Sequence, residues 1–178
     1  MGNVVQAGVK MNPARQAVVE AGLPVTVPAM TVNRVCGSGA QAIVSVAQEI
    51  LLGGANVAVA GGMENMDQAP YLVARGRWGH RLGDGQLYDS VLRDGLNDAF
   101  SGEPSGWHTE DLVEKYQLTR EVQDQWALRS QQLFARAKAA GHFKAQIAAV
   151  QVPGKKGRRN SSRTKPIGPT PPSKRSHD

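Results

Sequence analysis

The stretch Asn33-Arg34-Val35-Cys36-Gly37-Ser38-Gly39-Ala40 contains the single cysteine of this 178-residue chain. An apolar run with polar breaks over residues 25–35 precedes the cysteine, and its last part, 29–35, has the length of a strand. An apolar run of helical length follows the cysteine over 40–52. The sequence therefore predicts a strand that delivers Cys36 to the start of a helix. The free amides and the positive dipole end of a helix favour the thiolate, which is the nucleophilic form of cysteine. The two glycines after the cysteine would let a bulky acyl group approach the sulfur.

A lone cysteine also has a simpler interpretation. Cysteine outside disulfides is among the most buried residue types and packs as a small hydrophobe. The pattern Cys-Gly-Ser-Gly by itself leaves the nucleophile and the buried thiol open.

The segments around this turn predict an α/β fold. Asn12 before Pro13 marks the start of a helix that Gly22 ends. The helix over 40–52 is apolar on most sides, so we expect it to be buried, and residues 56–60 follow as a buried strand of a parallel sheet. A strand, a helix and a strand in this order form one right-handed crossover unit.

Between Thr109 and residue 152, the sequence carries mainly signals for helices. One helix opens at Thr109, and a second follows the N-cap Thr119, with Trp126 and Phe134 as expected core anchors. Residues 143–152 alternate loosely between apolar and polar types, which predicts a final strand.

The composition excludes several classes of protein. With 40% apolar residues the chain has ordinary hydrophobic content, no run reaches the roughly 18 residues of a membrane span, and no signal peptide is visible. A single cysteine argues against a disulfide framework and for a cytoplasmic location. No Cys/His group has metal-ligand spacing, so no metal or other cofactor is expected.

The net charge of +6 belongs to the end of the chain. Residues 1–150 carry 13 lysines and arginines against 14 acids, whereas residues 151–178 carry eight against one. We expect residues 153–178 to be a basic, disordered tail that either binds nucleic acid non-specifically or has no specific partner. A third hypothesis is that the residues from Arg158 onward are translated out of frame.

Two motifs carry a resemblance to a known family. The octapeptide continues as Gln41-Ala42-Ile43, and Val59-Ala60-Gly61-Gly62-Met63-Glu64-Asn65-Met66 follows the predicted helix. In composition, order and spacing, these motifs resemble the thiolases, which form or cleave 3-oxoacyl-CoA through an acylated cysteine. The resemblance implies a thiolase-like core, here an incomplete βαβαβ domain with a parallel-rich sheet and a buried helix, plus an inserted loop domain.

The resemblance also implies an activity. Thiolases are acyltransferases that convert acyl-CoA and acetyl-CoA to 3-oxoacyl-CoA and CoA, or the reverse. Cys36 would be the acyl-thioester nucleophile, and its amide would be an oxyanion donor. The implied partners are acyl-CoA and CoA, which are substrates rather than cofactors, and further copies of the chain in a dimer or tetramer.

The same resemblance divides the chain into parts. A partial core domain with the cysteine would cover residues 1–68, a loop domain 69–118, and a return to the core 119–152, before the tail at 153–178. In thiolases the loop domain covers the acyl-CoA tunnel.

Four residues of this predicted loop domain are candidate substrate contacts, namely Arg75, Arg77, Leu96 and His108. The motifs Arg75-Gly76 and Asp94-Gly95-Leu96 resemble that domain of thiolases. The two arginines would meet CoA phosphates, or would form surface ion pairs. His108 stands four places after the position of the family's His-Met-Gly motif.

Two groups that thiolases use are absent from these 178 residues. The base is a histidine of a Gly-His-Pro motif, the second cysteine belongs to a Cys-x-Gly-Gly motif, and neither motif occurs here. The expectation is a truncated thiolase that begins inside its first domain and has negligible turnover alone. Two alternatives are a non-catalytic interaction module with a basic tail and a cysteine acyl-CoA thioesterase that uses His108.

Overall fold

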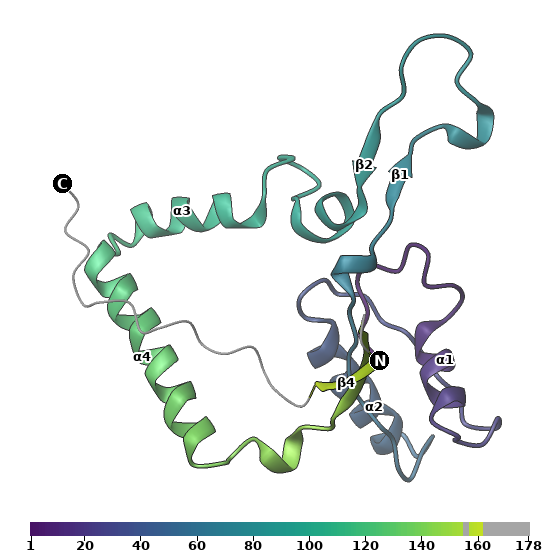
Figure 1. Ribbon diagram of the computed structural model, residues 1–178, viewed down its shortest axis with the longest axis vertical. Helices are drawn as coiled ribbons and strands as arrows, with labels where there is room; N and C mark the ends of the chain where they lie inside the picture. Colours follow the sequence, from purple (N-terminus) through teal and green to yellow (C-terminus); the bar gives the residue numbers. More distant parts are fainter. Residues whose placement is uncertain (155–156, 162–178) are drawn as a thin grey trace. The chain divides into compact units, whose positions relative to one another are not determined.

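The computed structural model describes residues 1–154 and 157–161 (Figure 1). Two compact units divide the chain, the first over Met1–Thr109 and the second from Glu110 onward. The first unit contains α1 (Pro13–Glu20), α2 (Ser38–Leu51), β1 (Tyr71–Val73) and β2 (Leu87–Asp89), with the short turns η1 (Met66–Gln68), η2 (Gly76–Trp78) and η3 (Leu92–Leu96). The helix α3 (Ser105–Lys115) spans the boundary, and the second unit continues with α4 (Arg120–Ala139), η4 (Lys144–Gln146), β3 (Val150–Gly154) and β4 (Gly157–Ser161).

The centre of the first unit is a parallel contact between three chain segments. Gly2 pairs with Val32 on one side and with Gly62 on the other. The Gly2 amide donates to the carbonyl of Gly61 at 2.8 Å, and the Gly2 carbonyl accepts from the amide of Met63 at 3.0 Å. The contact is parallel, as the predicted crossover unit requires, but each pairing is a single isolated bridge.

The prediction of two regular strands at this contact, over residues 29–35 and 56–60, is wrong. Neither residues 29–35 nor residues 56–60 form a ladder, and Val57 and Val59 are each 84% exposed rather than buried. A ladder requires repeated pairing along both strands, whereas the central segment bridges its neighbours only at Gly2. The two sheets within the described residues are the antiparallel pairs β1–β2 and β3–β4.

The helix α2 lies where the sequence predicts a helix, but its burial differs from the prediction. It ends before Gly53, whose φ of +75° is the left-handed conformation that commonly follows a helix. Its buried residues are Ser38 and Ala42, both near its start, whereas Ile43 and Leu51 are exposed. The expectation of a helix buried on most sides is therefore wrong for this chain, because its apolar faces lack a cover within the first unit.

The helix α1 begins as predicted. Pro13 occupies its first turn, and Asn12 Oδ1 accepts a hydrogen bond from the amide of Arg15 at 3.2 Å. The same side chain donates from Nδ2 to the carbonyl of Ala29 at 3.0 Å and accepts from the Thr31 hydroxyl at 2.9 Å. The cap therefore also ties α1 to the segment that leads to the cysteine turn.

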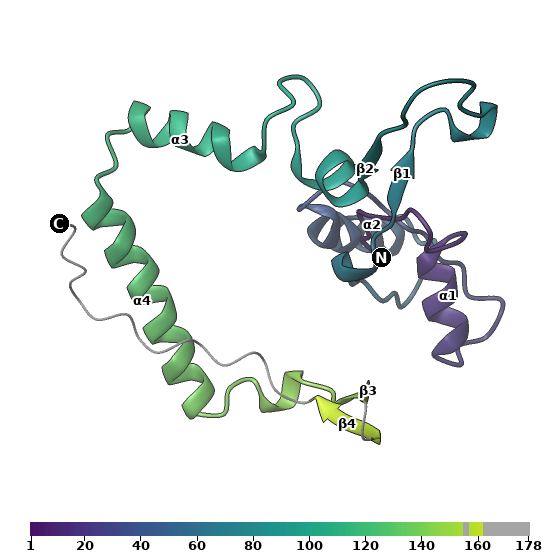
Figure 2. The same cartoon turned by 45° about the horizontal axis from the view of Figure 1, so that its top comes forward.

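An antiparallel hairpin follows the parallel contact. Tyr71 of β1 lies opposite Asp89 of β2, and Val73 lies opposite Leu87. The turn η2 lies beyond the paired strands, so that both views show the hairpin as a projecting arm (Figures 1 and 2).

The helix α4 begins where the sequence predicts, but one of its two expected core aromatic residues is exposed. Thr119 Oγ1 accepts from the amide three residues later at 3.4 Å, which caps the helix. Phe134 is half-buried and stacks on Phe143 with ring centroids 5.3 Å apart. Trp126 is 69% exposed, so its assignment as a core anchor is wrong, and it lies under the guanidinium group of Arg129 instead. Among the described helices, none is both long and apolar enough to cross a membrane.

Two further predictions in the later part of the chain need correction. The helix α3 starts at Ser105 rather than Thr109, because the carbonyl of Pro104 already accepts from the amide of Trp107 at 2.8 Å. The strand predicted over 143–152 is a short helical turn, η4, followed by β3.

The predicted basic tail overlaps a hairpin. Residues 157–161 form β4 and pair with β3, so the expectation of disorder is wrong for them. The other residues of the tail from position 155 onward lie outside the described residues, and the out-of-frame hypothesis stays a hypothesis.

Candidate functional site

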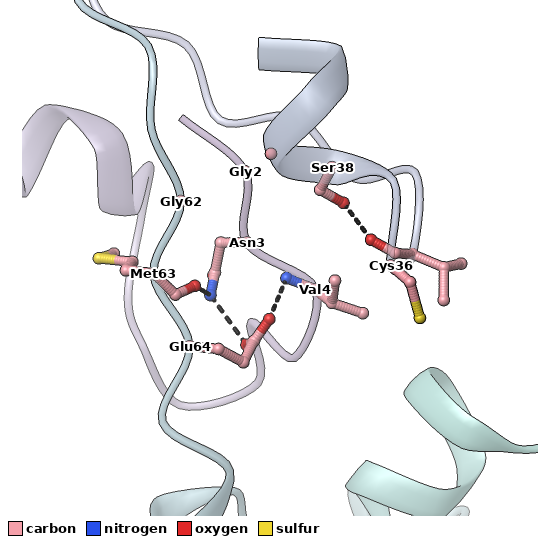
Figure 3. Close-up of a pocket in the computed structure, with 10 residues that line it drawn as sticks. Gly2, Asn3, Val4, Cys36, Ser38, Gly62, Met63 and Glu64 are labelled. Carbon is pink, nitrogen blue, oxygen red and sulfur yellow. Dashed lines mark hydrogen bonds between the residues drawn. The ribbon is translucent and has the colours of Figure 1, made fainter. Parts of the chain in front are cut away.

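Cys36 lies exposed on a tight turn directly before α2, as the sequence predicts. The preceding residue, Val35, has a φ of +49°, in the left-handed region that β-branched residues rarely adopt. Gly37 is the N-cap of the helix and places no side chain beside the sulfur. Figure 3 shows the sulfur pointing away from Ser38. A thiol presented in this way is accessible to a substrate.

The hydroxyl of Ser38 holds this turn. It accepts a hydrogen bond from the amide of Arg34 at 2.8 Å and donates to the carbonyl of Val35 at 2.6 Å (Figure 3). Asn33 Oδ1 accepts from the amide of Val35 at 3.0 Å. Because Ser38 is only 4% exposed, water competes weakly for its two bonds.

An open cavity of about 310 Å³ lies beside the cysteine (Figure 3). Its volume is at the lower end of the range for small-molecule sites. Residues from the three segments of the parallel contact and from the start of α2 line it: Gly2, Asn3, Val4, Val35, Cys36, Ser38, Gly39, Gly62, Met63 and Glu64. The two motifs that carry the family resemblance therefore meet at one cavity.

Glu64 fixes the backbone on the side of the cavity formed by the N-terminal segment. Its Oε1 accepts from Asn3 Nδ2 and from the amide of Val5, each at 3.0 Å, and its Oε2 accepts from the amide of Val4 at 2.9 Å. Asn3 Nδ2 also donates to the carbonyl of Met63 at 2.9 Å. Hydrogen bonds to a carboxylate are among the strong ones, so this cluster positions the N-terminal segment against the Gly-Gly-Met-Glu loop.

Replacing Glu64 with glutamine should loosen the N-terminal segment. The new NH₂ group faces either the amide of Val4 or the donors of Asn3 and Val5, so at least one donor loses its acceptor, at a cost of about 1–3 kcal/mol. Faster amide hydrogen exchange at Val4 and Val5 would measure the loss. The matched control is Glu49→Gln on the exposed part of α2, with an expected change within about 0.5 kcal/mol. Unchanged exchange at both amides would contradict this role of Glu64.

The four candidate residues of the predicted loop domain do not line this cavity. Among its described lining residues there is no Arg75, Arg77, Leu96 or His108. Arg75 precedes η2 with a φ of +60°, Arg77 lies within η2, and Leu96 ends η3. The structure does not bring these side chains together with Cys36, and their role as substrate contacts stays a prediction.

His108 belongs to a polar chain that joins α3 to the loop before it. Its Nε2 lies 2.9 Å from Ser101 Oγ, which also hydrogen-bonds to Asp98 Oδ1 at 3.0 Å. The amides of Ser101 and Phe100 donate to the same carboxylate oxygen at 2.8 and 3.1 Å. The hydrogen bonds from Ser101, with smaller contributions from the Phe100 amide and the charge of His108, lower the pKa of Asp98 from its ordinary value.

Sequence reasoning missed the conformation of the cysteine turn. A serine near a turn commonly bonds the backbone, and Ser38 stands in the quoted motif, so this signal was available. The positive φ of Val35 has no such signal, because valine disfavours that conformation. Within the described part of the chain, no group of His, Cys, Asp and Glu side chains could hold a metal ion.

Comparison with known sequences identifies relatives that match most of the chain. The family model described as "Thiolase, N-terminal domain" matches residues 1–169. Acetyl-CoA acetyltransferase of Pseudomonas aeruginosa is 52% identical over 157 residues, covering 88% of this chain and 40% of the relative. Acetyl-CoA acetyltransferase of Escherichia coli is 52% identical over 153 residues, covering 85% and 39%. A probable acetyl-CoA acyltransferase of Staphylococcus epidermidis is 48% identical over 157 residues, covering 88% and 40%.

A solved structure gives the same result at the level of the fold. The crystal structure of Bacillus anthracis acetyl-CoA acetyltransferase matches with a TM-score of 0.87 at 39% identity, covering 93% of this chain and 42% of that chain. This likeness confirms the predicted α/β thiolase-like fold. The chain spans about 40% of the length of the curated relatives it matches. Family match, relatives and fold together show that this chain belongs to the thiolase family and carries residues of its N-terminal domain.

Proposed function

We propose that this chain supplies the acyl-accepting cysteine of a thiolase-type acyltransferase. The observation that supports this proposal is the exposed Cys36 thiol, held on a strained turn before α2 and beside a cavity. Relatives named acetyl-CoA acetyltransferase favour a CoA thioester as the acyl donor. The reaction proposed for the complete protein is acyl-CoA plus acetyl-CoA to 3-oxoacyl-CoA plus CoA, or the reverse.

The first half of this reaction needs a nucleophile and an oxyanion donor. Cys36 Sγ, after loss of its proton, attacks the carbonyl carbon of acyl-CoA and forms a tetrahedral oxyanion. We assign the Cys36 amide as one donor to that oxyanion. The bond between the acyl carbon and the CoA sulfur then breaks, the acyl group stays on Cys36, and CoA leaves as a thiol with the released proton.

The second half needs groups that these 178 residues do not contain. A second acyl-CoA must lose an α proton before its carbon can attack the acyl-cysteine, and this step requires a base. The family resemblance implies a second cysteine for this deprotonation and a Gly-His-Pro histidine for activation of the nucleophile, and the sequence holds neither. We therefore propose that this chain alone accepts one acyl group without turnover. We further propose a homo-oligomer for the complete protein and a cytoplasmic location, where a catalytic thiol stays reduced.

The proposal is tested by incubating the 178-residue protein with acetyl-CoA. We expect one stable acetyl group per chain, mapped to Cys36 by mass spectrometry of a digest. We expect 3-oxoacyl-CoA formation at least about 10⁴-fold below that of a complete thiolase, because catalytic groups that act as a unit fail together. The acetyltransferase of Escherichia coli can serve as the complete enzyme in the same assay.

Two outcomes would overturn the proposal. An unmodified Cys36 would remove the acyl-accepting role. Continuous release of acetate with no adduct would instead indicate a thioesterase. In the structure His108 bonds to Ser101 and does not line the cavity at Cys36, so no observation favours the thioesterase.

A further inference from the structure

The peptide group that joins Val35 to Cys36 is held through its carbonyl. That oxygen accepts from Ser38 Oγ at 2.6 Å and from the amide of Ser38 at 3.0 Å. In a planar trans peptide, the C=O and the N–H bonds point in opposite directions. Two hydrogen bonds that fix the Val35 carbonyl therefore also fix the direction of the Cys36 amide, which is the oxyanion donor of the proposed function.

This peptide needs to be held because its neighbour is strained. A valine at φ +49° keeps that conformation only when its surroundings stabilise it. Asn33 Oδ1 binds the amide of Val35, and the Ser38 hydroxyl binds the amide of Arg34 as well as the Val35 carbonyl. Ser38 thus bonds to backbone groups on both sides of the strained residue.

The Ser38 hydroxyl has no proton free for direct chemistry. Its one proton is donated to the Val35 carbonyl, its oxygen accepts from the Arg34 amide, and the side chain is 4% exposed. The cysteine sulfur points away from it (Figure 3). Any effect of Ser38 on the reaction must therefore pass through the backbone of the turn.

We propose that Ser38 is a positioning residue for acyl transfer, whose hydroxyl sets the direction of the Cys36 amide toward the developing oxyanion. This inference rests on the proposed function and adds a residue to it. It distinguishes two reactions of the same thiol. Attack on a thioester passes through an oxyanion and needs the amide, whereas displacement of iodide from iodoacetamide needs only the thiolate.

The test compares these two reactions in the 178-residue protein. Acetylation of Cys36 by acetyl-CoA and alkylation by iodoacetamide are followed by mass in wild type, Ser38→Ala and the control Ser45→Ala, which lies on the same helix. We expect Ser38→Ala to slow acetylation at least about tenfold, since removal of an oxyanion donor costs more than that, and to change alkylation less than about twofold. Ser45→Ala should change neither rate. Circular dichroism confirms that each variant is folded.

A second variant keeps the test decisive if Ser38→Ala is poorly folded. Glycine adopts positive φ without strain, so Val35→Gly should reduce the dependence on the serine. In the Val35→Gly background, Ser38→Ala should slow acetylation by less than the tenfold expected beside Val35, a comparison that does not need Ser38→Ala alone. Where Ser38→Ala is folded, a double-mutant cycle measures the difference. Equal loss of both reactions, no loss of acetylation, or additive effects in the cycle would overturn the positioning role while the proposed function stands. A wild-type chain that is alkylated but never acetylated would overturn both.

Discussion

Alanine in place of Cys36 is expected to abolish acyl transfer to the chain. After incubation with acetyl-CoA, the mass of Cys36→Ala should stay that of the unmodified protein, whereas the wild type gains one acetyl group. The physical reason is that Cys36 is the only thiol in the sequence, and the thiolate is far more nucleophilic at neutral pH than the hydroxyl groups that remain. Intact-protein mass spectrometry measures the result directly.

The control for this experiment is Cys36→Ser, which keeps the shape of the side chain. Glu64 is the one carboxylate among the described residues that line the cavity, and its oxygens already accept from Asn3 and from the amides of Val4 and Val5. Serine at position 36 therefore lacks an activating base and should react below about 1% of the wild-type rate. The free energy of unfolding of both variants should lie within about 0.5 kcal/mol of the wild-type value, because the side chain is exposed. An acetyl group on the alanine variant at the wild-type rate would show that the acceptor lies elsewhere in the chain.

Alanine in place of Gly2 should destabilise the first unit as a whole. A Cβ at this position would lie 2.6 Å from the carbonyl carbon of Ser38 and 2.8 Å from the nitrogen of Gly39, closer than real Cβ atoms come. Both are backbone atoms at the start of α2, so they cannot yield as a flexible side chain would. Overpacking of this kind typically costs 1–3 kcal/mol, and we expect about 3 kcal/mol because the three-segment contact must separate.

Urea unfolding of Gly2→Ala measures this loss, and hydrogen exchange at the amide of Met63 locates it at the parallel contact. The matched control is Gly39→Ala, because a Cβ there meets nothing within 4 Å and the residue is helical. Alanine at that helical position should stabilise the chain by roughly 0.5–1 kcal/mol. Equal stability of the two variants would show that Gly2 does not pack against α2.

Local signals in the sequence predicted the helices well. Asn12 and Thr119 cap their helices as expected, because a cap depends on residues that are neighbours in the chain. The position of Cys36 before α2 follows from the same kind of signal. The prediction of burial was wrong where burial depends on segments distant in the sequence, because the side chains of Val57 and Val59 are exposed. An apolar run predicts that its side chains are buried, but their exposed fraction depends on which distant segments pack against them.

At the candidate site, too, the sequence predicted some features and not others. The two motifs that carry the family resemblance, the cysteine turn and the Gly-Gly-Met-Glu loop, both lie at one cavity. Sequence reasoning did not predict that Val35 adopts a positive φ, because this conformation depends on the hydrogen bond that Ser38 donates to the Val35 carbonyl and the one that Asn33 accepts from the Val35 amide. The hydrogen bonds that Glu64 accepts from the amides of Val4 and Val5 also join segments that the sequence alone could not pair.

The bond between the Val4 amide and Glu64 spans 60 positions of the chain, and this separation has a consequence for biosynthesis. The turn around Cys36 is held by Ser38 and other near neighbours, so it can form as soon as the start of α2 has left the ribosome. The wall that Glu64 completes cannot form until residue 64 has been synthesised, and it joins segments whose pairing adds the entropy cost of closing a long loop. The residues that shape the cysteine turn are therefore synthesised before the carboxylate that completes the wall of the cavity.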